Sequence, residues 1–144
     1  MPVVSRAEIV IARPIAAVFS ELVDFGRWKR WMPPVFRPAR GPAGPLSATD
    51  SLVVLLGGAL PMRLRVVRVS PPSELAWRGG LPGLLVGEHA FYLEDLGSST
   101  RVVSEERFTG LLAHTPIVQG LVERSGTKAG TAMLSALSLA FESA

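Results

Sequence analysis

The chain has 144 residues, of which 48% are hydrophobic, and this is enough for one domain with a core of its own. It contains no cysteine, which excludes disulfide bonds, thiolate nucleophiles and zinc–thiolate sites and fits a reducing cytoplasm. The formal net charge of +3 leaves nucleic acid and anionic membranes to be considered, but no apolar run reaches the length of a membrane span. We therefore expect a cytoplasmic protein with a single domain over residues 1–144 and no stable membrane insertion.

The N-terminal part of the chain predicts a strand followed by two short helices. Residues Val3–Ala12 alternate between apolar and polar positions, as expected of a half-buried strand. Pro14 suits the start of a helix over Ile15–Val23, because a proline is tolerated in the first helical turn. Asp24 can cap a second short helical segment over Phe25–Trp31.

The middle of the chain predicts antiparallel strands separated by turns rich in glycine, proline and serine. The expected strands are Val35–Ala39, Ser51–Leu56, Met62–Val69, Glu74–Arg78, Glu88–Asp95 and Thr100–Thr109.

Two features of this region have more than one interpretation. The consecutive Val66 and Val67 suggest a β-bulge. The segment Gly79–Gly87 is predicted as an unusually apolar, glycine-rich loop. That loop could form a gate, a membrane-touching edge or a dimer contact, or it could simply cover the edge of the core.

The C-terminal part predicts one long helix over Thr115–Ser143, with Thr115 as its cap and Pro116 in its first turn. An apolar stripe follows the helical period through Val118, Leu121, Val122, Ser125, Ala129, Met133, Ala136, Leu137 and Ala140. Three glycines interrupt this helix at positions 120, 126 and 130, each costing about 1 kcal/mol relative to alanine. They indicate either close packing on a sheet or space above a cavity.

The order of these elements predicts an α+β fold of the helix-grip type. A curved antiparallel sheet of about seven strands would wrap around the C-terminal helix, with the two short helices placed after the first strand.

The hairpin over Glu88–Asp95 and Thr100–Thr109 has one inner face on each strand, and residue parity determines how the two faces pair. The odd positions of the first strand and the even positions of the second point inward. A four-residue loop then pairs Leu93 with Val102, Phe91 with Ser104, and His89 with Glu106. Directly opposed residues have Cβ atoms roughly 4.5–5.5 Å apart. The sequence therefore predicts a His89–Glu106 pair on the concave face, under the long helix.

The His89–Glu106 pair has two interpretations. In the functional one it is a general acid/base pair, or a polar anchor for a ligand in an apolar pocket. In the structural one each side chain satisfies the other once both are buried. An inward carboxylate costs up to several kcal/mol unless it is compensated, which an apolar residue would avoid, so the functional interpretation stays open.

Other side chains on the predicted inner faces could line the same pocket. Three tryptophans could bind a flat or greasy ligand, although plain core packing accounts for them equally well. The candidate ligand-binding set is Trp28, Trp31, Leu64, Trp77, Phe91, Ser104, Phe108, Leu121 and Met133.

Metal and cofactor sites are not indicated by the sequence. His89 and His114 are the only histidines, and no ligand spacing surrounds them. The chain has no phosphate-binding loop, dinucleotide fingerprint or nucleophile elbow. We expect no metal and no cofactor.

Basic residues cluster at Arg27, Lys29, Arg30, Arg37 and Arg40, with Trp28, Trp31 and Phe36 between them. We interpret this cluster as a solvated rim with its aromatic side chains turned inward, and we expect no nucleic-acid binding. A basic loop near a pocket mouth that attracts acidic ligands is the intermediate interpretation.

Five segments give the chain a family resemblance: Arg13–Phe19, Leu22–Trp31, Ser70–Gly79, Gly87–Glu94 and Glu106–Gly110. In this order they resemble the SRPBCC proteins, which include START-related lipid-transfer domains, Bet v 1-like proteins and polyketide cyclases. The resemblance covers nearly the whole chain. It implies a helix-grip fold that encloses a cavity for a hydrophobic small molecule, and no universal catalytic residue can be carried across.

These observations give three functional hypotheses. The first is a protein that binds or carries a hydrophobic or aromatic small molecule, such as a lipid or polyketide, between sheet and C-terminal helix. The second is an enzyme of the cyclase, aromatase or dehydratase kind that uses His89 and Glu106 for proton transfer. The third is a protein-interaction module, as in the chaperone-activating relatives of this fold. A homodimer is compatible with all three.

Overall fold

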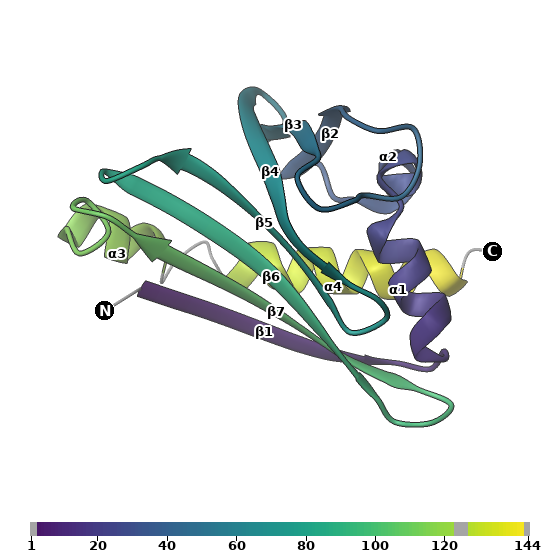
Figure 1. Ribbon diagram of the computed structural model, residues 1–144. Coiled ribbons are helices and arrows are strands. Elements are labelled where there is room, and N and C mark those ends of the chain that lie inside the picture. The colour runs from purple at the N-terminus through teal and green to yellow at the C-terminus, as the bar shows by residue number, and fades with distance from the viewer. Residues whose placement is uncertain (1–2, 123–126, 143–144) are drawn as a thin grey trace.

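The structure of the protein, a computed structural model, describes residues 3–122 and 127–142 (Figure 1). The strands are β1 Val3–Ile11, β2 Phe36–Arg40, β3 Ser51–Leu56, β4 Leu60–Ser70, β5 Glu74–Leu81, β6 Leu85–Asp95 and β7 Thr100–Thr109. The helices are α1 Ile15–Val23, the 3-10 helix η1 Phe25–Arg27, α2 Trp28–Trp31, α3 Pro116–Leu121 and α4 Thr127–Glu142.

One antiparallel sheet of seven strands, in the order β1-β7-β6-β5-β4-β3-β2, forms the framework. Helix α4 runs across one face of this sheet and contacts β1, β7 and α2 (Figure 1). The α+β helix-grip arrangement predicted from the sequence is confirmed. Among the described residues, no helix is both long enough and apolar enough to cross a membrane.

Gly130 shows how closely α4 approaches the sheet. A Cβ atom at this position would lie 3.2 Å from the hydroxyl oxygen of Ser104 on β7. Such a contact is tighter than most Cβ contacts, so the small residue lets helix and strand come together. Of the two interpretations of these glycines, close packing on the sheet applies at Gly130.

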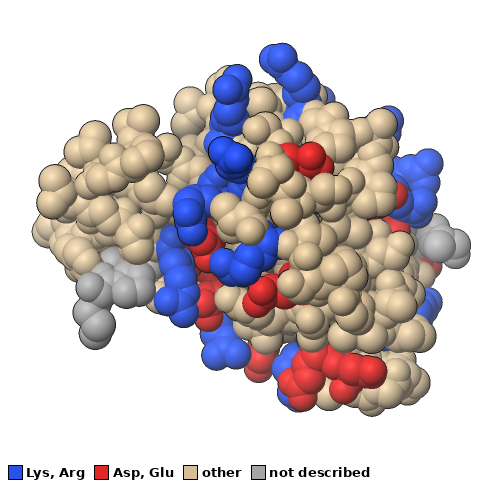
Figure 2. All heavy atoms as spheres, in the orientation of Figure 1, with Lys and Arg blue, Asp and Glu red and all other residues tan. Residues whose placement is uncertain are grey.

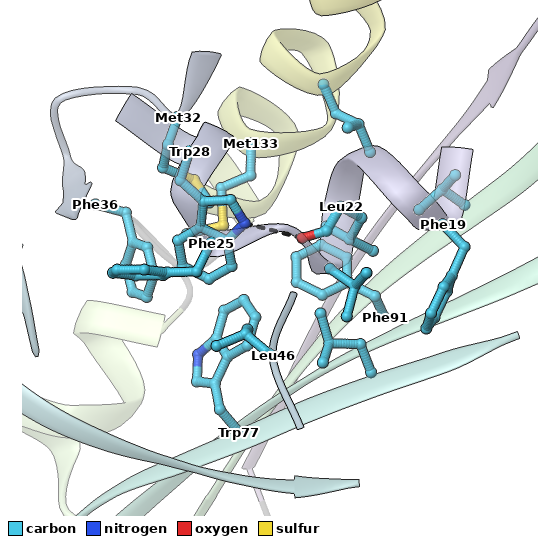
Figure 3. Packing of buried hydrophobic residues seen from close by; sticks show 14 of the residues in the cluster. Phe19, Leu22, Phe25, Trp28, Met32, Phe36, Leu46, Trp77, Phe91 and Met133 are labelled. Atoms are coloured by element: carbon cyan, nitrogen blue, oxygen red, sulfur yellow. Dashed lines mark hydrogen bonds between the residues drawn. The ribbon is translucent and has the colours of Figure 1, made fainter. Parts of the chain in front are cut away.

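The N-terminal helices complete the core above the sheet. Helix α1 buries Val18, Phe19 and Leu22, which recur at helical spacing. The carboxylate of Asp24 accepts a hydrogen bond from the backbone N–H of Gly26, at 3.1 Å, and so caps η1 as predicted. The indole Nε1–H of Trp28 donates to the carbonyl of Leu22 over 2.8 Å and joins α2 to α1 inside the core (Figure 3).

The predicted loop over Gly79–Gly87 is wrong. Strands β5 and β6 continue through most of it and pair Gly79 with Gly87 and Gly80 with Val86, so that only a tight turn remains. Gly80 and Gly83 have φ values of 122° and 83°, a backbone region that favours glycine. The glycines therefore shape a hairpin end rather than an irregular segment.

Of the helix predicted over Thr115–Ser143, the structure describes two parts, α3 and α4. Thr115 caps α3 by accepting from the N–H of Val118, with Pro116 in the first turn, as predicted. Residues 123–126 lie outside the described part of the chain.

The register predictions are confirmed. Strand β6 pairs with β7 so that Leu93 lies opposite Val102, Phe91 opposite Ser104, and His89 opposite Glu106. The β4–β5 ladder shifts register between Val66 and Arg68, which is the bulge suggested by the two valines.

Two buried tryptophans differ in one hydrogen bond and form a natural pair for a stability test. Trp28 donates to Leu22, whereas the buried Nε1 of Trp31 has no hydrogen-bond partner. We expect Trp28→Phe to lower the free energy of unfolding more than Trp31→Phe, by about 1–2 kcal/mol, because only the first leaves a buried carbonyl without its donor. Urea unfolding of both variants measures the difference. Equal losses would contradict this role for the Trp28 bond.

Candidate functional site

A cavity of about 190 Å³ lies against the inner face of the sheet. Every described residue that lines it belongs to a strand, and none belongs to α4. The lining residues are Phe36, Leu56, Met62, Leu64, Trp77, Gly79, Gly80, Leu85, Gly87, His89, Glu106 and Phe108. Gly80 at the hairpin end is exposed, whereas His89 is buried, so the cavity extends from the surface toward His89.

Two glycines supply part of the cavity wall as bare backbone. Gly79 and Gly87 face each other across β5 and β6. A Cβ atom at Gly79 would come within 2.6 Å of Leu64, and one at Gly87 within 3.1 Å of Phe108. The cavity therefore depends on the absence of side chains at these two positions.

His89 is 4% exposed and is held on two sides. Its ring stacks on Phe91 with a centroid distance of 4.6 Å, and its Nε2 atom lies 2.7 Å from the hydroxyl oxygen of Ser104. The Nδ1 atom is buried and has no hydrogen-bond partner. If the Ser104 hydroxyl donates to Nε2, Nδ1 carries the proton and is a donor; in the other tautomer Nε2 donates and Nδ1 is an acceptor.

Glu106 faces His89 across the cavity wall. Its Oε1 atom lies 3.8 Å from Nδ1 of His89, which is too long for a direct hydrogen bond. The structural interpretation requires that the two side chains satisfy each other by hydrogen bonding. At this distance they do not. A ligand oxygen or a water molecule between them could bond to both.

Desolvation shifts the pKa values of both His89 and Glu106 in the direction that favours the neutral form of each side chain. Desolvation lowers the pKa of His89 from 6.5 to about 3. Desolvation raises the pKa of Glu106 from 4.5 to about 7. Near neutral pH the cavity thus presents a neutral imidazole beside a carboxyl group that is close to half-protonated.

The candidate ligand-binding residues divide into four groups in the structure, the fourth being Trp31 alone. Leu64, Trp77 and Phe108 line the cavity together with His89 and Glu106. Trp28, Phe91, Ser104 and Met133 are buried but do not line it, and Figure 3 shows Trp28, Phe91 and Met133 within the core. Phe91 and Ser104 instead position His89. The side chain of Leu121 lies outside the described part of the structure.

Trp31 lines a different hollow, of about 350 Å³, between the N-terminal helices and α4. Its other lining residues are Glu21, Arg27, Arg30, Ala136, Leu139 and Ala140. Arg27 already pairs with Glu21 at 2.8 Å. Although this hollow is larger, it has fewer apolar walls, and we regard the cavity beside His89 as the better candidate site.

The basic cluster around the N-terminal helices has the predicted pattern of exposed and buried side chains. The arginine and lysine side chains are exposed, whereas Trp28, Trp31 and Phe36 are buried. The cluster is a solvated rim with its aromatic residues turned inward.

The candidate set drawn from the sequence missed several cavity-lining residues, namely Phe36, Leu56, Met62, Leu85 and the three glycines. The glycines could have been found, because Gly79 and Gly87 stand symmetrically about the Pro82-Gly83 turn. Phe36 and Leu56 could not, because their place at the cavity follows from how far the sheet curves.

Within the described residues, no group of three or more histidine, aspartate or glutamate side chains is placed to hold a metal ion. The chemistry available in the cavity is hydrogen bonding and proton transfer at His89 and Glu106.

Comparisons with known proteins give a family and a fold. The family described as polyketide cyclase / dehydrase and lipid transport matches residues 2–140. Among curated proteins, none matches the chain in sequence.

Solved structures with the same fold share little sequence with the chain. The Zhui aromatase/cyclase from Streptomyces sp. R1128 is 16% identical with a TM-score of 0.73, over 99% of this chain and 94% of that one. Norcoclaurine synthase from Thalictrum flavum is 14% identical with a TM-score of 0.75, over 100% of this chain and 88% of that one. A protein from Thermobifida fusca is 20% identical with a TM-score of 0.75, over 98% and 94% of the two chains. At these identities the likeness shows the fold alone.

The raised pKa of Glu106 predicts how stability depends on pH. The folded protein binds the proton of Glu106 more tightly than the unfolded chain does. The contribution of this group to the free energy of unfolding is therefore fully present below about pH 4.5 and is lost as the pH rises through about 7. The change in pKa corresponds to at most about 3 kcal/mol. Glu106→Gln removes this titration. The difference in unfolding free energy, wild type minus variant, should therefore decrease as the pH rises from about 4.5 to about 7. The contribution of His89 is present in both proteins and largely cancels in this difference.

Urea unfolding of both proteins over this pH range measures the difference. Glu94→Gln, at an exposed position on β6, is the control and should leave the wild-type profile unchanged. A difference that does not vary with pH would contradict the desolvation of Glu106.

Proposed function

The chain belongs to the polyketide cyclase/dehydrase and lipid transport family, and from this premise we propose that it binds an uncharged hydrophobic or aromatic small molecule in the cavity beside His89. The SRPBCC resemblance drawn from the sequence is thereby confirmed. The observation that carries the proposal is an apolar cavity lined by His89, a residue whose buried Nδ1 atom has no hydrogen-bond partner. A buried polar atom left unpaired costs about 1–3 kcal/mol, so a ligand that pairs with it recovers part of that cost.

The size of the cavity limits the ligand. An apolar cavity of about 150 Å³ accommodates benzene in another protein. At about 190 Å³, the cavity beside His89 has room for one aromatic ring with a small substituent. A larger lipid-like or polyketide-like ligand would extend past Gly80 toward solvent or would displace wall side chains.

The walls favour a flat, uncharged ligand. Trp77, Phe36 and Phe108 present aromatic surface, and the glycine wall lets a ring approach the backbone closely. An anionic ligand would lose its hydration against these walls and meet no positive charge from His89, which is neutral near pH 7. This cavity also distinguishes the proposal from an interaction module, for which no internal space is needed.

A second candidate function is an enzyme of the cyclase, aromatase or dehydratase kind, and Glu106 is the observation that favours it. A pKa of about 7 suits a group that both accepts and releases a proton near neutral pH. Glu106 would take a proton from carbon next to a substrate carbonyl. His89, with the Ser104 hydroxyl donating to Nε2, would donate a hydrogen bond from Nδ1 to the carbonyl oxygen and stabilise the enolate that forms.

The remaining expectations stay predictions. A cytoplasmic location, a possible homodimer and the lack of nucleic-acid binding form part of this proposal.

Two ligands that differ by one hydroxyl group test the binding proposal. We expect p-cresol to bind more tightly than toluene by roughly fivefold, because its hydroxyl group can pair with Nδ1 of His89 at a gain of about 1 kcal/mol. Quenching of tryptophan fluorescence measures both affinities, since Trp77 lines the cavity. In His89→Phe the preference should disappear while toluene still binds. If neither compound binds the wild-type protein, the proposal is wrong.

Proton exchange in a small ketone tests the enzyme alternative. Exchange of the α-protons of phenylacetone in deuterated water, followed by NMR, needs the same acid and base as a cyclisation. General acid–base catalysis contributes roughly 10²–10⁴-fold, so His89→Ala and Glu106→Gln should each slow exchange by at least about tenfold. Glu94→Gln is the control. Wild-type exchange no faster than in buffer would rule out the alternative for this substrate class.

A further inference from the structure

One end of the molecule exposes a group of large apolar side chains. This apolar tip consists of Leu81 and Leu84 at the β5–β6 turn, and Leu111, Leu112 and Ile117 at and before α3. Their exposed fractions are 65%, 44%, 80%, 44% and 76%, in that order. Residues 79–87 and 110–122 contain no lysine, arginine, aspartate or glutamate. Figure 2 shows the result as a lobe without charged side chains at the left of the molecule.

Backbone hydrogen bonds hold the two parts of the apolar tip together. The N–H groups of Leu111 and Leu112 donate to the carbonyls of Gly83 and Leu84, at 3.1 and 2.9 Å. Gly110 has a φ of 107° and lies so close to the Leu84 carbonyl that no Cβ would fit. These backbone contacts fix the position of the β5–β6 turn against the segment before α3. The leucine side chains of the apolar tip remain exposed in this arrangement.

Arginine side chains border the apolar tip. Arg63 and Arg65 on β4 are exposed and form no ion pair with any residue that the structure describes. Arg78 and Arg107 flank a hollow beside the turn at Pro82-Gly83 and pair with Glu88 and Glu105. In Figure 2 a band of mostly blue side chains, with red ones between them, runs along the edge of the uncharged lobe. We call Arg63, Arg65, Arg78 and Arg107 the arginine band.

We propose that the apolar tip docks on the surface of an anionic lipid bilayer. The leucines and Ile117 would enter the headgroup region, and the arginine band would lie over acidic headgroups. Apolar side chains flanked by cations are suited to this boundary, because one group leaves water while the other meets negative charge. No part of the chain crosses the bilayer in this arrangement. The proposal goes beyond small-molecule binding, although the exposed end of the cavity, at Gly80, lies at the same hairpin.

The charge pattern favours a membrane over a second copy of the chain. A symmetric dimer through the apolar tip would bring two arginine bands close together, and like charges across an interface cost affinity. An anionic surface instead uses both the apolar and the basic parts.

Vesicle flotation with the wild-type protein tests the proposal. We expect the protein to float with vesicles of phosphatidylcholine and phosphatidylglycerol, and much less with phosphatidylcholine alone. High salt should weaken the binding, because it screens the arginine band.

Variants at the two parts of the surface make the test specific. Leu111→Asp and Ile117→Asp should each weaken binding to the mixed vesicles by at least roughly tenfold, since a large apolar side chain no longer enters the bilayer. Leu96→Asp, in the β6–β7 turn at the other end of the sheet, is the matched control and should bind as wild type. Arg63→Gln and Arg65→Gln should weaken binding roughly fivefold each, and Arg30→Gln, beside α1 and α2, should not.

Circular dichroism establishes that each variant is folded before flotation. The proposal is overturned if the wild-type protein does not float with the mixed vesicles, or if the control variants lose as much binding as the tip variants. Failure to float together with a dimer that Leu111→Asp dissociates, measured by sedimentation, would assign the apolar tip to self-association instead.

Discussion

The antiparallel register between β6 and β7 is the constraint on which the cavity depends. If β6 slipped by one residue, His89 would turn to the outer face, away from Glu106, and Glu88 would turn inside. The structure secures the register from both sides of β7. Strand β1 pairs along its length, and the buried hydroxyl group of Thr100 donates to the carbonyl of Arg13 over 2.8 Å, next to the β6–β7 turn. The polar chemistry of the site is therefore set by backbone pairing before any side chain adjusts.

This part of the site could be predicted from the sequence because it is local. Four residues of turn and the alternation of inner and outer positions are enough to place His89 opposite Glu106. The polar contacts around them were not predictable in the same way. Ser104 bonds to the ring of His89, and Glu106 remains 3.8 Å away, because stacking on Phe91 fixes the imidazole. These distances depend on packing from several strands.

The other differences from the sequence prediction have non-local causes. Gly79 and Gly87 are poor strand residues by propensity, yet they pair because flanking residues on β5 and β6 already hold the ladder. The position of the cavity follows from sheet curvature, and hydrophobic periodicity carries no information about it. Trp77 shows the same limit, since its ring contacts both Trp28 in the core and His89 in the cavity, at 5.2 Å each.

The facing glycines of β5 and β6 have a consequence for how this cavity can diversify. Because the wall at Gly79 and Gly87 is backbone, any side chain added there presses on Leu64 or Phe108 and narrows the space. The outline of an acceptable ligand can thus change through one substitution that leaves His89 and Glu106 untouched. Conversely, a substitution of similar size at the polar pair, such as Glu106→Gln, changes the proton chemistry and leaves the glycine wall intact. Shape selection and proton chemistry are encoded at separate positions, so each can drift independently among descendants of the same sequence.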